Sequence, residues 1–312
     1  MQKNNLGKII KELRKKKNLT QQELAYDLCS ISQLYRIEKG LHFPSAFLIE
    51  GFSKRLCENL FKYNFFSNCN YPVYFFDFFD NLEHLRLKRQ YKSILSLINL
   101  ISHNPKYKYD INLPNIKQLL GWYKGISISN NQNKFVSVDY YFDLLRLTNN
   151  FSLSNDINFK TLTIYEIKIV CSIGITYLKL EKYNLAKEIF FLIIENINYL
   201  DSDTSFPLLC EIYYNISKLF YIERDYSKAI EYANLGISLC IYNYFSYFLA
   251  DLFYILGKCY EYLNDTKNAI ENYNKFIYLY DIIGHDSSSL AHKTYLINKF
   301  TPSIKLIKNN SL

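Results

Sequence analysis

The sequence has few of the residues that interrupt helices. Only nine glycines and six prolines occur among 312 residues, whereas turn-rich β folds need many of both. Nearly half of the residues are apolar, which is enough to build a sizeable core. The scarcity of helix breakers therefore argues against a turn-rich β protein and favours an all-α fold.

Signatures of several other protein classes are also missing. The seven cysteines are scattered without C-x-x-C spacing and the five histidines lie far apart, so we expect reduced thiols, no metal site and no cofactor. No stretch approaches the ~18 apolar residues of a membrane span, and the N-terminus lacks an apolar signal core. A Gly-rich phosphate loop, H-E-x-x-H and G-x-S-x-G are absent. These absences indicate a cytoplasmic protein that is neither membrane-bound nor an enzyme.

The positive charge is concentrated near the N-terminus. The net charge is +8, and residues 1–58 contain eleven Lys and Arg against six Asp and Glu. A small basic segment of this kind suits binding to the phosphates of nucleic acid. We expect Lys16 and Lys17 to contact phosphates without regard to base sequence.

Residues 6–60 carry the signals of four short helices. Apolar residues at helical spacing mark the first, and these are Leu6, Ile9, Ile10 and Leu13. Thr20-x-x-Glu23 and Ser30-x-x-Gln33 predict capped starts for the second and third. Gly40 predicts a left-handed end of the third. The second helix is expected to bury Leu24, Ala25 and Leu28. The fourth starts at Pro44-Ser45 and is expected to bury Phe47, Leu48, Phe52 and Leu56.

The stretch LTQQELA…S-x-L-x-RIEKG, followed by PS and FSKRL, resembles the XRE/Cro-type helix-turn-helix domain. The resemblance implies a DNA-binding domain of the five-helix type in residues 1–62. It implies a phosphate contact from Gln21 and a structural salt bridge between Arg14 and Glu38. It also places four residues of the recognition helix at base edges in the major groove, namely Ile31, Ser32, Gln33 and Arg36.

The residue types on the recognition helix suit this role unequally. Arg36 and Gln33 can each form two hydrogen bonds to a purine edge, whereas Ile31 can only make apolar contact, for instance with a thymine methyl group. Three neighbours are expected to contact phosphates, namely Tyr35, Lys39 and His42. Taken one at a time, each of these polar residues is equally compatible with an ordinary solvated surface.

Residues 61–90 are densely aromatic, and Pro72 interrupts any single helix through them. We expect residues 63–80 to connect two domains. Their aromatic side chains are predicted to be buried either in the core of the chain or against a second copy.

The remainder of the chain contains an internal repeat. Small residues at positions 174, 217 and 257 each precede an alanine by twelve residues, at Ala186, Ala229 and Ala269. A weaker copy has Gly125 and Ser137, and a degenerate one includes Tyr91-x-x-Ile94. The small residues would let paired helices approach closely, and stacked pairs would bury a continuous core. We expect residues 81–312 to form about five helix pairs and a final helix near residues 289–307.

This repeat resembles the tetratricopeptide repeat, L-G-x2-Y…A-x3-F, with a longer period and without the usual proline. The resemblance implies a right-handed superhelix whose concave groove, lined by the first helix of each pair, binds a peptide. Mapped onto the motif, the groove-facing residues are Trp122, Lys168, Cys171, Glu211, Tyr214, Asn215, Lys218, Asp251, Tyr254 and Lys258. Asn215 would hold a peptide backbone, and Lys218 would meet a carboxylate. Trp122, the one tryptophan of the sequence, is of a residue type that more often lies in a core than serves as a platform for a ligand.

The combination of head and repeats resembles the RNPP group of Gram-positive quorum-sensing regulators, and within it the PlcR-like branch. The resemblance implies a homodimer that binds a palindromic DNA operator and is controlled by a short signalling peptide. Two alternatives stay open at this point. The repeats could instead bind a protein partner, as in phage or toxin–antitoxin control, or the chain could be of the related Rgg type.

Overall fold

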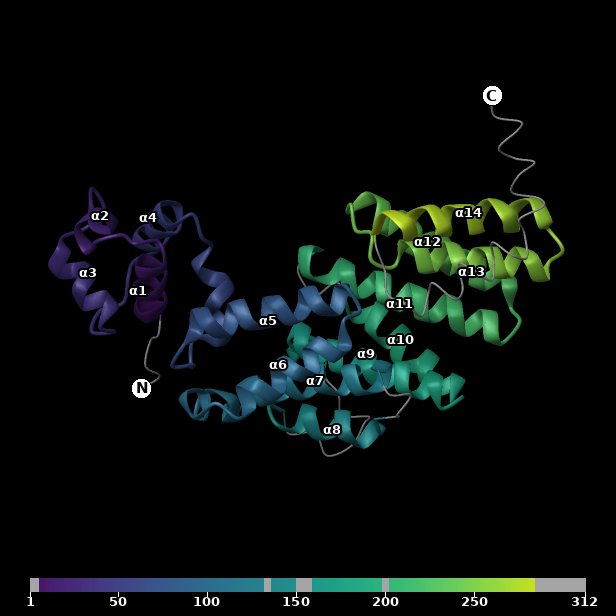
Figure 1. Ribbon diagram of the computed structural model, residues 1–312, viewed down its shortest axis with the longest axis horizontal. Coiled ribbons are helices and arrows are strands. Elements are labelled where there is room, and N and C mark those ends of the chain that lie inside the picture. Colours follow the sequence, from purple (N-terminus) through teal and green to yellow (C-terminus); the bar gives the residue numbers. More distant parts are fainter. Residues whose placement is uncertain (1–5, 132–135, 150–158, 198–201, 284–312) are drawn as a thin grey trace, which may run out of the picture. The chain divides into compact units, whose positions relative to one another are not determined.

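The structure is a computed structural model that describes residues 6–131, 136–149, 159–197 and 202–283. All regular elements in these ranges are helices, and no strand occurs among them (Figure 1). The predicted all-α fold is therefore confirmed. The chain divides into two compact units, one comprising residues 1–86 and 93–123 and the other residues 87–92 and 124–312.

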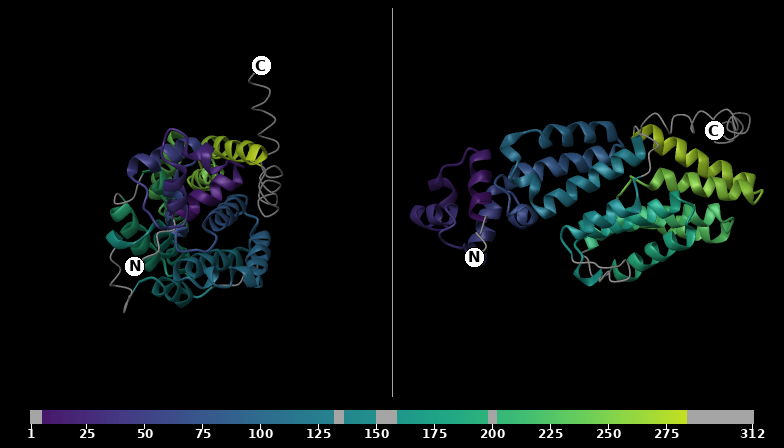
Figure 2. Two further views of the ribbon diagram at one scale, coloured as in Figure 1. Left: turned by 90° about the vertical axis from the view of Figure 1, so that its left-hand side faces the viewer. Right: turned by 90° about the horizontal axis from the view of Figure 1, so that it is seen from below.

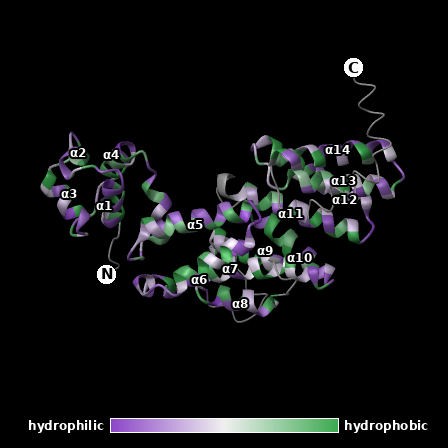
Figure 3. Cartoon of the chain, viewed as in Figure 1, coloured by the Kyte–Doolittle hydropathy of each residue, from purple (hydrophilic) through white to green (hydrophobic). Residues whose placement is uncertain are grey.

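Four helices form the N-terminal head. They are α1 (Leu6–Lys16), α2 (Gln21–Ala25), α3 (Ile31–Glu38) and α4 (Ala46–Leu56). Hydrophobic and hydrophilic residues alternate along them (Figure 3). Their apolar faces share one core, in which the predicted Ile9, Ile10 and Leu13 meet Leu34 and Ile37.

The predicted helix ends are confirmed in detail. Thr20 and Glu23 form a reciprocal capping box at α2, and the Ser30 side chain accepts the Gln33 backbone N–H at α3. Gly40 has φ 71°, and the next residue donates its N–H to the carbonyl of Arg36 at 2.9 Å. A left-handed residue after the helix, with this bond, satisfies carbonyls that α3 would otherwise leave unpaired.

The expected burial of α4 is wrong at one position. Phe47 is 66% exposed, and Ile49 lies in the core in its place. The apolar positions of α4 allow either side chain to face inward, and it is Ile49 that packs into the core shared with α1, α2 and α3. Leu28 follows the end of α2 and is only partly buried against the core.

The aromatic segment contributes to the same unit as the head. It forms η1 (Leu60–Phe66) and the first half of α5 (Pro72–Leu87). Leu60, Tyr63 and Val73 are part of the core of the head, and the rings of Phe66 and Phe79 stack at 5.5 Å. Several of these aromatics, among them Tyr63, Phe66 and Phe79, are buried in an internal core, as one of the two expectations held, whereas Phe61 and Tyr74 are exposed. The domain boundary near residue 62 stays a prediction.

The rest of the first unit consists of α6 (Tyr91–Ser102), the short turns η2 (Pro105–Tyr107) and η3 (Asp110–Asn112), and the start of α7 (Pro114–Asn131). The second unit continues with α8 (Val138–Arg146), η5 (Phe159–Thr161), α9 (Ile164–Lys179), α10 (Tyr183–Asn196), α11 (Ser202–Ile222), α12 (Tyr226–Tyr242), α13 (Leu249–Tyr262) and α14 (Thr266–Ile283). Within this unit α9 packs beside α10, α11 beside α12 and α13 beside α14 (Figure 2). The predicted final helix near residues 289–307 lies outside the described residues.

The small residues of the repeat do what their spacing predicts. Ala186, Ala229 and Ala269 are almost fully buried. A Cβ atom added to Gly257 would lie 2.5 Å from the ring of Tyr273, so α13 and α14 pack more closely than any larger residue allows. At the equivalent serine, Ser217 Oγ donates to the carbonyl of Ala229 at 2.8 Å.

The turn inside each described pair has one shared conformation. Glu181, Arg224 and Asn264 each follow the small residue of their repeat by seven positions and have φ between 60° and 65°. Arg89, between α5 and α6, has φ 57°. Together with Ile94, which is buried at the position of the repeat alanine, this turn identifies α5 and α6 as the degenerate first pair.

Replacement of Gly7 by alanine should destabilise the head strongly. A Cβ atom there would lie 1.7 Å from the carbonyl oxygen of Ile37, and backbone atoms cannot rotate away. We expect the free energy of unfolding to fall by about 3 kcal/mol or more. Gly51→Ala is the matched control, because its Cβ atom meets only the end of the Leu28 side chain and should cost clearly less. Equal losses in denaturant titrations of the two variants would contradict the close packing of α1 on α3.

Candidate functional site

The outer face of α3 is open to solvent. Ile31, Ser32, Tyr35 and Arg36 are exposed and Gln33 is half-buried, while Leu34 and Ile37 point into the core. Lys39 lies with its Nζ atom 5.7 Å from the centroid of the Tyr35 ring, and His42 is exposed just beyond. The structure therefore brings the predicted DNA-facing residues onto one surface of the head.

A buried carboxylate holds this surface in place. Glu38, only 7% exposed, accepts hydrogen bonds from Arg14 Nε at 2.6 Å and Arg14 Nη2 at 3.1 Å. Arg14 Nη1 also donates to the carbonyl of Leu19 at 2.7 Å. The predicted structural bridge between α1 and α3 is thus confirmed, and its bidentate geometry fixes the orientation of both helices.

Gln21 takes part in the same network. Its Nε2 atom donates to Glu38 Oε2 at 2.8 Å, so three segments of the head meet at one carboxylate. The phosphate contact expected of Gln21 stays a prediction, because in the structure its amide N–H is directed inward to Glu38.

In the second unit, four of the predicted ligand-facing residues lie near one another. Tyr214 and Lys218 come from α11, and Asp251 and Tyr254 come from α13. Burial and the nearby carboxylate of Asp251 raise the pKa of Tyr214. These helices are both the first of their pairs, as the repeat motif predicts for residues that share a face.

Asp251 is already paired within the unit. Its carboxylate accepts a hydrogen bond from Arg89, and the Arg89 guanidinium lies 5.4 Å from the ring centroid of Tyr247. The sequence pattern does not predict Arg89 or Tyr247, since no motif connects a turn to a helix 162 residues later. Asp251 is therefore the counter-ion of an arginine as well as a residue facing Lys218.

Lys218 and Lys179 form a local concentration of positive charge. Both residues are exposed by surface area. Neighbouring protein atoms nevertheless desolvate their amines, and this desolvation lowers the pKa of each. The charge of Lys218 further lowers the pKa of Lys179, while Asp251 acts on Lys218 in the opposite direction. An anion placed beside these amines would relieve their repulsion and favour their charged forms. Lys179 lies outside the predicted set.

Other predicted ligand-facing residues are less accessible. Trp122 is 3% exposed and the guanidinium of Arg86 lies over its ring, which places it in the core of the first unit. Asn215 is 6% exposed, and its Nδ2 atom donates to the carbonyl of Glu211 at 2.7 Å. Cys171 is buried as well. Three further members of the set are half-buried, namely Lys168, Glu211 and Lys258. Peptide contacts from all of these stay predictions.

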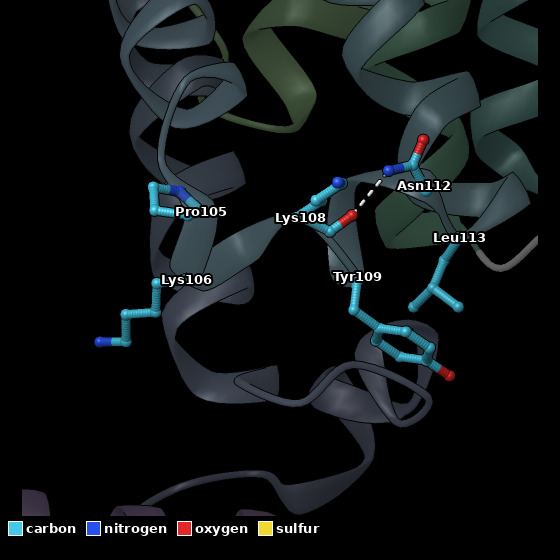
Figure 4. Close-up of a pocket in the computed structure, with 6 residues that line it drawn as sticks. All are labelled: Pro105, Lys106, Lys108, Tyr109, Asn112 and Leu113. Atoms are coloured by element: carbon cyan, nitrogen blue, oxygen red, sulfur yellow. Dashed lines mark hydrogen bonds between the residues drawn. The ribbon is translucent and has the colours of Figure 1, made fainter.

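A shallow hollow lies on the first unit at the turns η2 and η3. Pro105 and Lys106 line one side, and Tyr109 and Leu113 line the other (Figure 4). Two of the lining residues are hydrogen-bonded to each other, since Asn112 Nδ2 donates to the carbonyl of Lys108 at 2.6 Å. None of these residues belongs to the predicted sites.

Among the described residues, no cluster of three or more His, Cys, Asp or Glu side chains is placed to hold a metal ion. Within the same ranges, no helix combines the length and the hydropathy needed to cross a membrane.

Solved structures share this architecture. PlcR of Bacillus thuringiensis, in complex with the peptide PapR7 and DNA, has a TM-score of 0.74 at 21% identity, covering 95% of this chain and 99% of that one. The apo form of PlcR has a TM-score of 0.58 at the same identity and coverage. ComR from S. thermophilus, in complex with DNA and its signalling peptide ComS, has a TM-score of 0.55 at 20% identity, covering 93% and 99%. At such identities these likenesses show the fold.

Two family models match the sequence itself. A helix-turn-helix model matches residues 10–56, and the model of the RNPP family C-terminal domain matches residues 79–296. A comparison with the curated proteins finds no match. Because the C-terminal model covers well over half of the chain and follows a matched helix-turn-helix, this protein belongs to the RNPP family.

Proposed function

We propose that this protein is a transcription regulator that reads DNA with α3 as a cytoplasmic homodimer and is controlled by a short signalling peptide bound to its repeats. It has no catalytic role in this proposal. The observation that carries it is the exposed face of α3, which is held rigid from behind by the buried Glu38 network.

The side chains on the outer face of α3 have the chemistry needed for sequence-specific DNA reading. Arg36 is exposed and lies two residues before the Glu38 anchor on the same helix, so its guanidinium can be presented to a guanine edge. The basic surplus of the head supplies sequence-independent attraction to phosphates. Helix-turn-helix proteins commonly bind as dimers to two half-sites, and PlcR and ComR form complexes with DNA.

The second unit has charged and apolar side chains that suit a peptide ligand. Lys179 and Lys218 are crowded cations that a carboxylate would stabilise, and Tyr214 and Tyr254 offer apolar surface beside them. A short peptide with a free C-terminus or an acidic side chain has both properties. PlcR and ComR were solved with the peptides PapR7 and ComS, which supports the same class of ligand here.

Substitution of Arg36 tests base reading. Arg36→Ala should reduce the ratio of affinities for a preferred and a mutated duplex by about 10- to 100-fold, because one bidentate base contact is worth about 1–3 kcal/mol of discrimination. Lys54→Ala is the control, since it removes an exposed cation of the head that is paired with Glu50. Fluorescence anisotropy with both duplexes measures the ratio. Unchanged discrimination in Arg36→Ala would remove this residue from base readout.

Substitution of Lys218 tests the peptide site. A small reading frame beside the gene, encoding a secretion signal and a short tail, would supply the probe as a synthetic peptide. Lys218→Met should weaken its binding by about tenfold, as expected for loss of one charge-assisted hydrogen bond. In the wild type, affinity should fall as the pH rises through the lowered pKa of Lys218, because only the protonated amine attracts a carboxylate.

The matched control is a carboxamide variant of each acidic group in the peptide. If Lys218 binds a carboxylate, calorimetry should show that one such change mimics Lys218→Met and adds nothing to it. Equal affinities of wild type and Lys218→Met at every pH would rule the assignment out. If the repeats bind no peptide but retain a protein in a pull-down, the protein-partner alternative replaces this part of the proposal.

A further inference from the structure

One polar face of α1 is directed at the start of α5. Lys8, Glu12 and Lys16 are four residues apart and therefore lie in one row along the helix. Lys16 Nζ pairs with Asp77 Oδ2 at 2.6 Å, and Glu12 Oε2 accepts the backbone N–H of Val73 at 3.2 Å. The sequence predicts a DNA phosphate as the partner of Lys16, whereas the structure gives all three residues partners at the beginning of α5.

Lys8 completes the row at its N-terminal end. Its Nζ atom lies 5.9 Å from the ring centroid of Tyr71, which precedes Pro72, the first residue of α5. All three residues of α1 thus meet consecutive parts of the same short segment.

Carboxylates from two distant parts of the sequence accept N–H groups at this helix start. Pro72 has no N–H to offer, so the first donor of α5 is Val73, which Glu12 binds from α1. Just before the helix, the backbone N–H of Asn70 donates to Asp110 Oδ1 at 2.6 Å. Asp110 opens η3 and is fully buried. Negative charge at the N-terminus of α5 is also favoured by the helix dipole.

The charges at this joint act on one another. Burial raises the pKa of both Glu12 and Asp110, whereas their backbone N–H partners and Lys8 lower it. The charge of Asp110 also raises the pKa of Glu12. The two carboxylates therefore share Lys8 as a counter-charge, and neither is an independent surface group.

We propose that Lys8, Glu12, Lys16, Asp77 and Asp110 form a clasp that fixes the orientation of the DNA-reading head on α5. They are positioning residues, and Lys16 acts through Asp77 instead of through a DNA phosphate. This inference rests on the proposed DNA reading by a dimer. Two heads can occupy two half-sites together only if each is held at a set angle, since a loosely held head lowers the effective concentration of the second binding event.

Asp77→Asn separates the two roles of Lys16. It removes a negative charge, so a phosphate-contacting Lys16 would bind all DNA equally well or better. If the clasp is correct, Asp77→Asn reduces the affinity ratio between a duplex with both half-sites and a duplex with one, by about tenfold. The duplexes are those that the wild-type chain selects from a random pool. Asp77 is half exposed, so the variant should fold, which thermal melting verifies.

Asp80→Asn is the matched control, because it makes the same charge change at an exposed position of the same helix. It should leave the ratio unchanged. A second pair of variants tests the buried part of the clasp. Glu12→Ala should reduce the ratio, and Glu12→Gln should restore it in part, since an amide oxygen can still accept the Val73 N–H.

Equal ratios in the wild type, Asp77→Asn and Glu12→Ala would overturn the clasp while leaving DNA reading intact. A wild-type chain that selects no duplex would overturn the proposed function, and the role of the clasp with it.

Discussion

The head is organised around the carboxylate of Glu38. It is withdrawn from solvent and receives a forked arginine from α1 and an amide from the start of α2, so the positions of three helices are coupled through two oxygen atoms. Removal of one partner of such a pair typically costs about 3–5 kcal/mol, because the remaining charge is left buried. Arg36 lies on the same helix, two residues earlier, and faces outward. The same eight-residue helix therefore carries both the buried Glu38 that fixes its position and the exposed Arg36 that is proposed to read DNA.

The helix pairs of the repeats are built with one recurring local pattern. A small residue in the first helix admits the second helix at close range, and seven residues later a left-handed residue reverses the chain. This pattern recurs at Gly174, Ser217 and Gly257. Because the geometry recurs, side chains at equivalent positions of α11 and α13 come to share a face, which is how Lys218, Tyr214 and Asp251 meet. Arg89 enters this group from the turn of the degenerate first pair, so even the weakest repeat contributes to the candidate ligand surface.

Most of the fold could be predicted from local signals in the sequence. Capping boxes, the glycine after α3 and the alanines of the repeats are each recognised from a few neighbouring residues, because the free energy that selects them is local. Prediction from sequence failed where packing between distant segments determines which side chain is buried. Phe47 and Ile49 are both apolar and lie two positions apart. Only the packing of the other head helices determines that Ile49 is buried and Phe47 is exposed. Burial too depends on neighbouring helices, since Trp122 and Asn215 match ligand-facing motif positions and are largely buried, while their peptide contacts stay predictions. The contacts of Glu12 with Val73 and of Arg89 with Asp251 join residues 61 and 162 positions apart, and no short pattern encodes them.

The central claim is that α3 reads a DNA sequence in pairs. The most direct test is selection of binding sites by the full-length chain from a pool of random duplexes, followed by sequencing of the bound fraction. The account predicts enrichment of one inverted repeat, with half-site centres about one helical turn apart or a multiple of it. Enrichment of a single unrepeated site would contradict pairing, and a bound pool as random as the starting pool would contradict sequence reading itself.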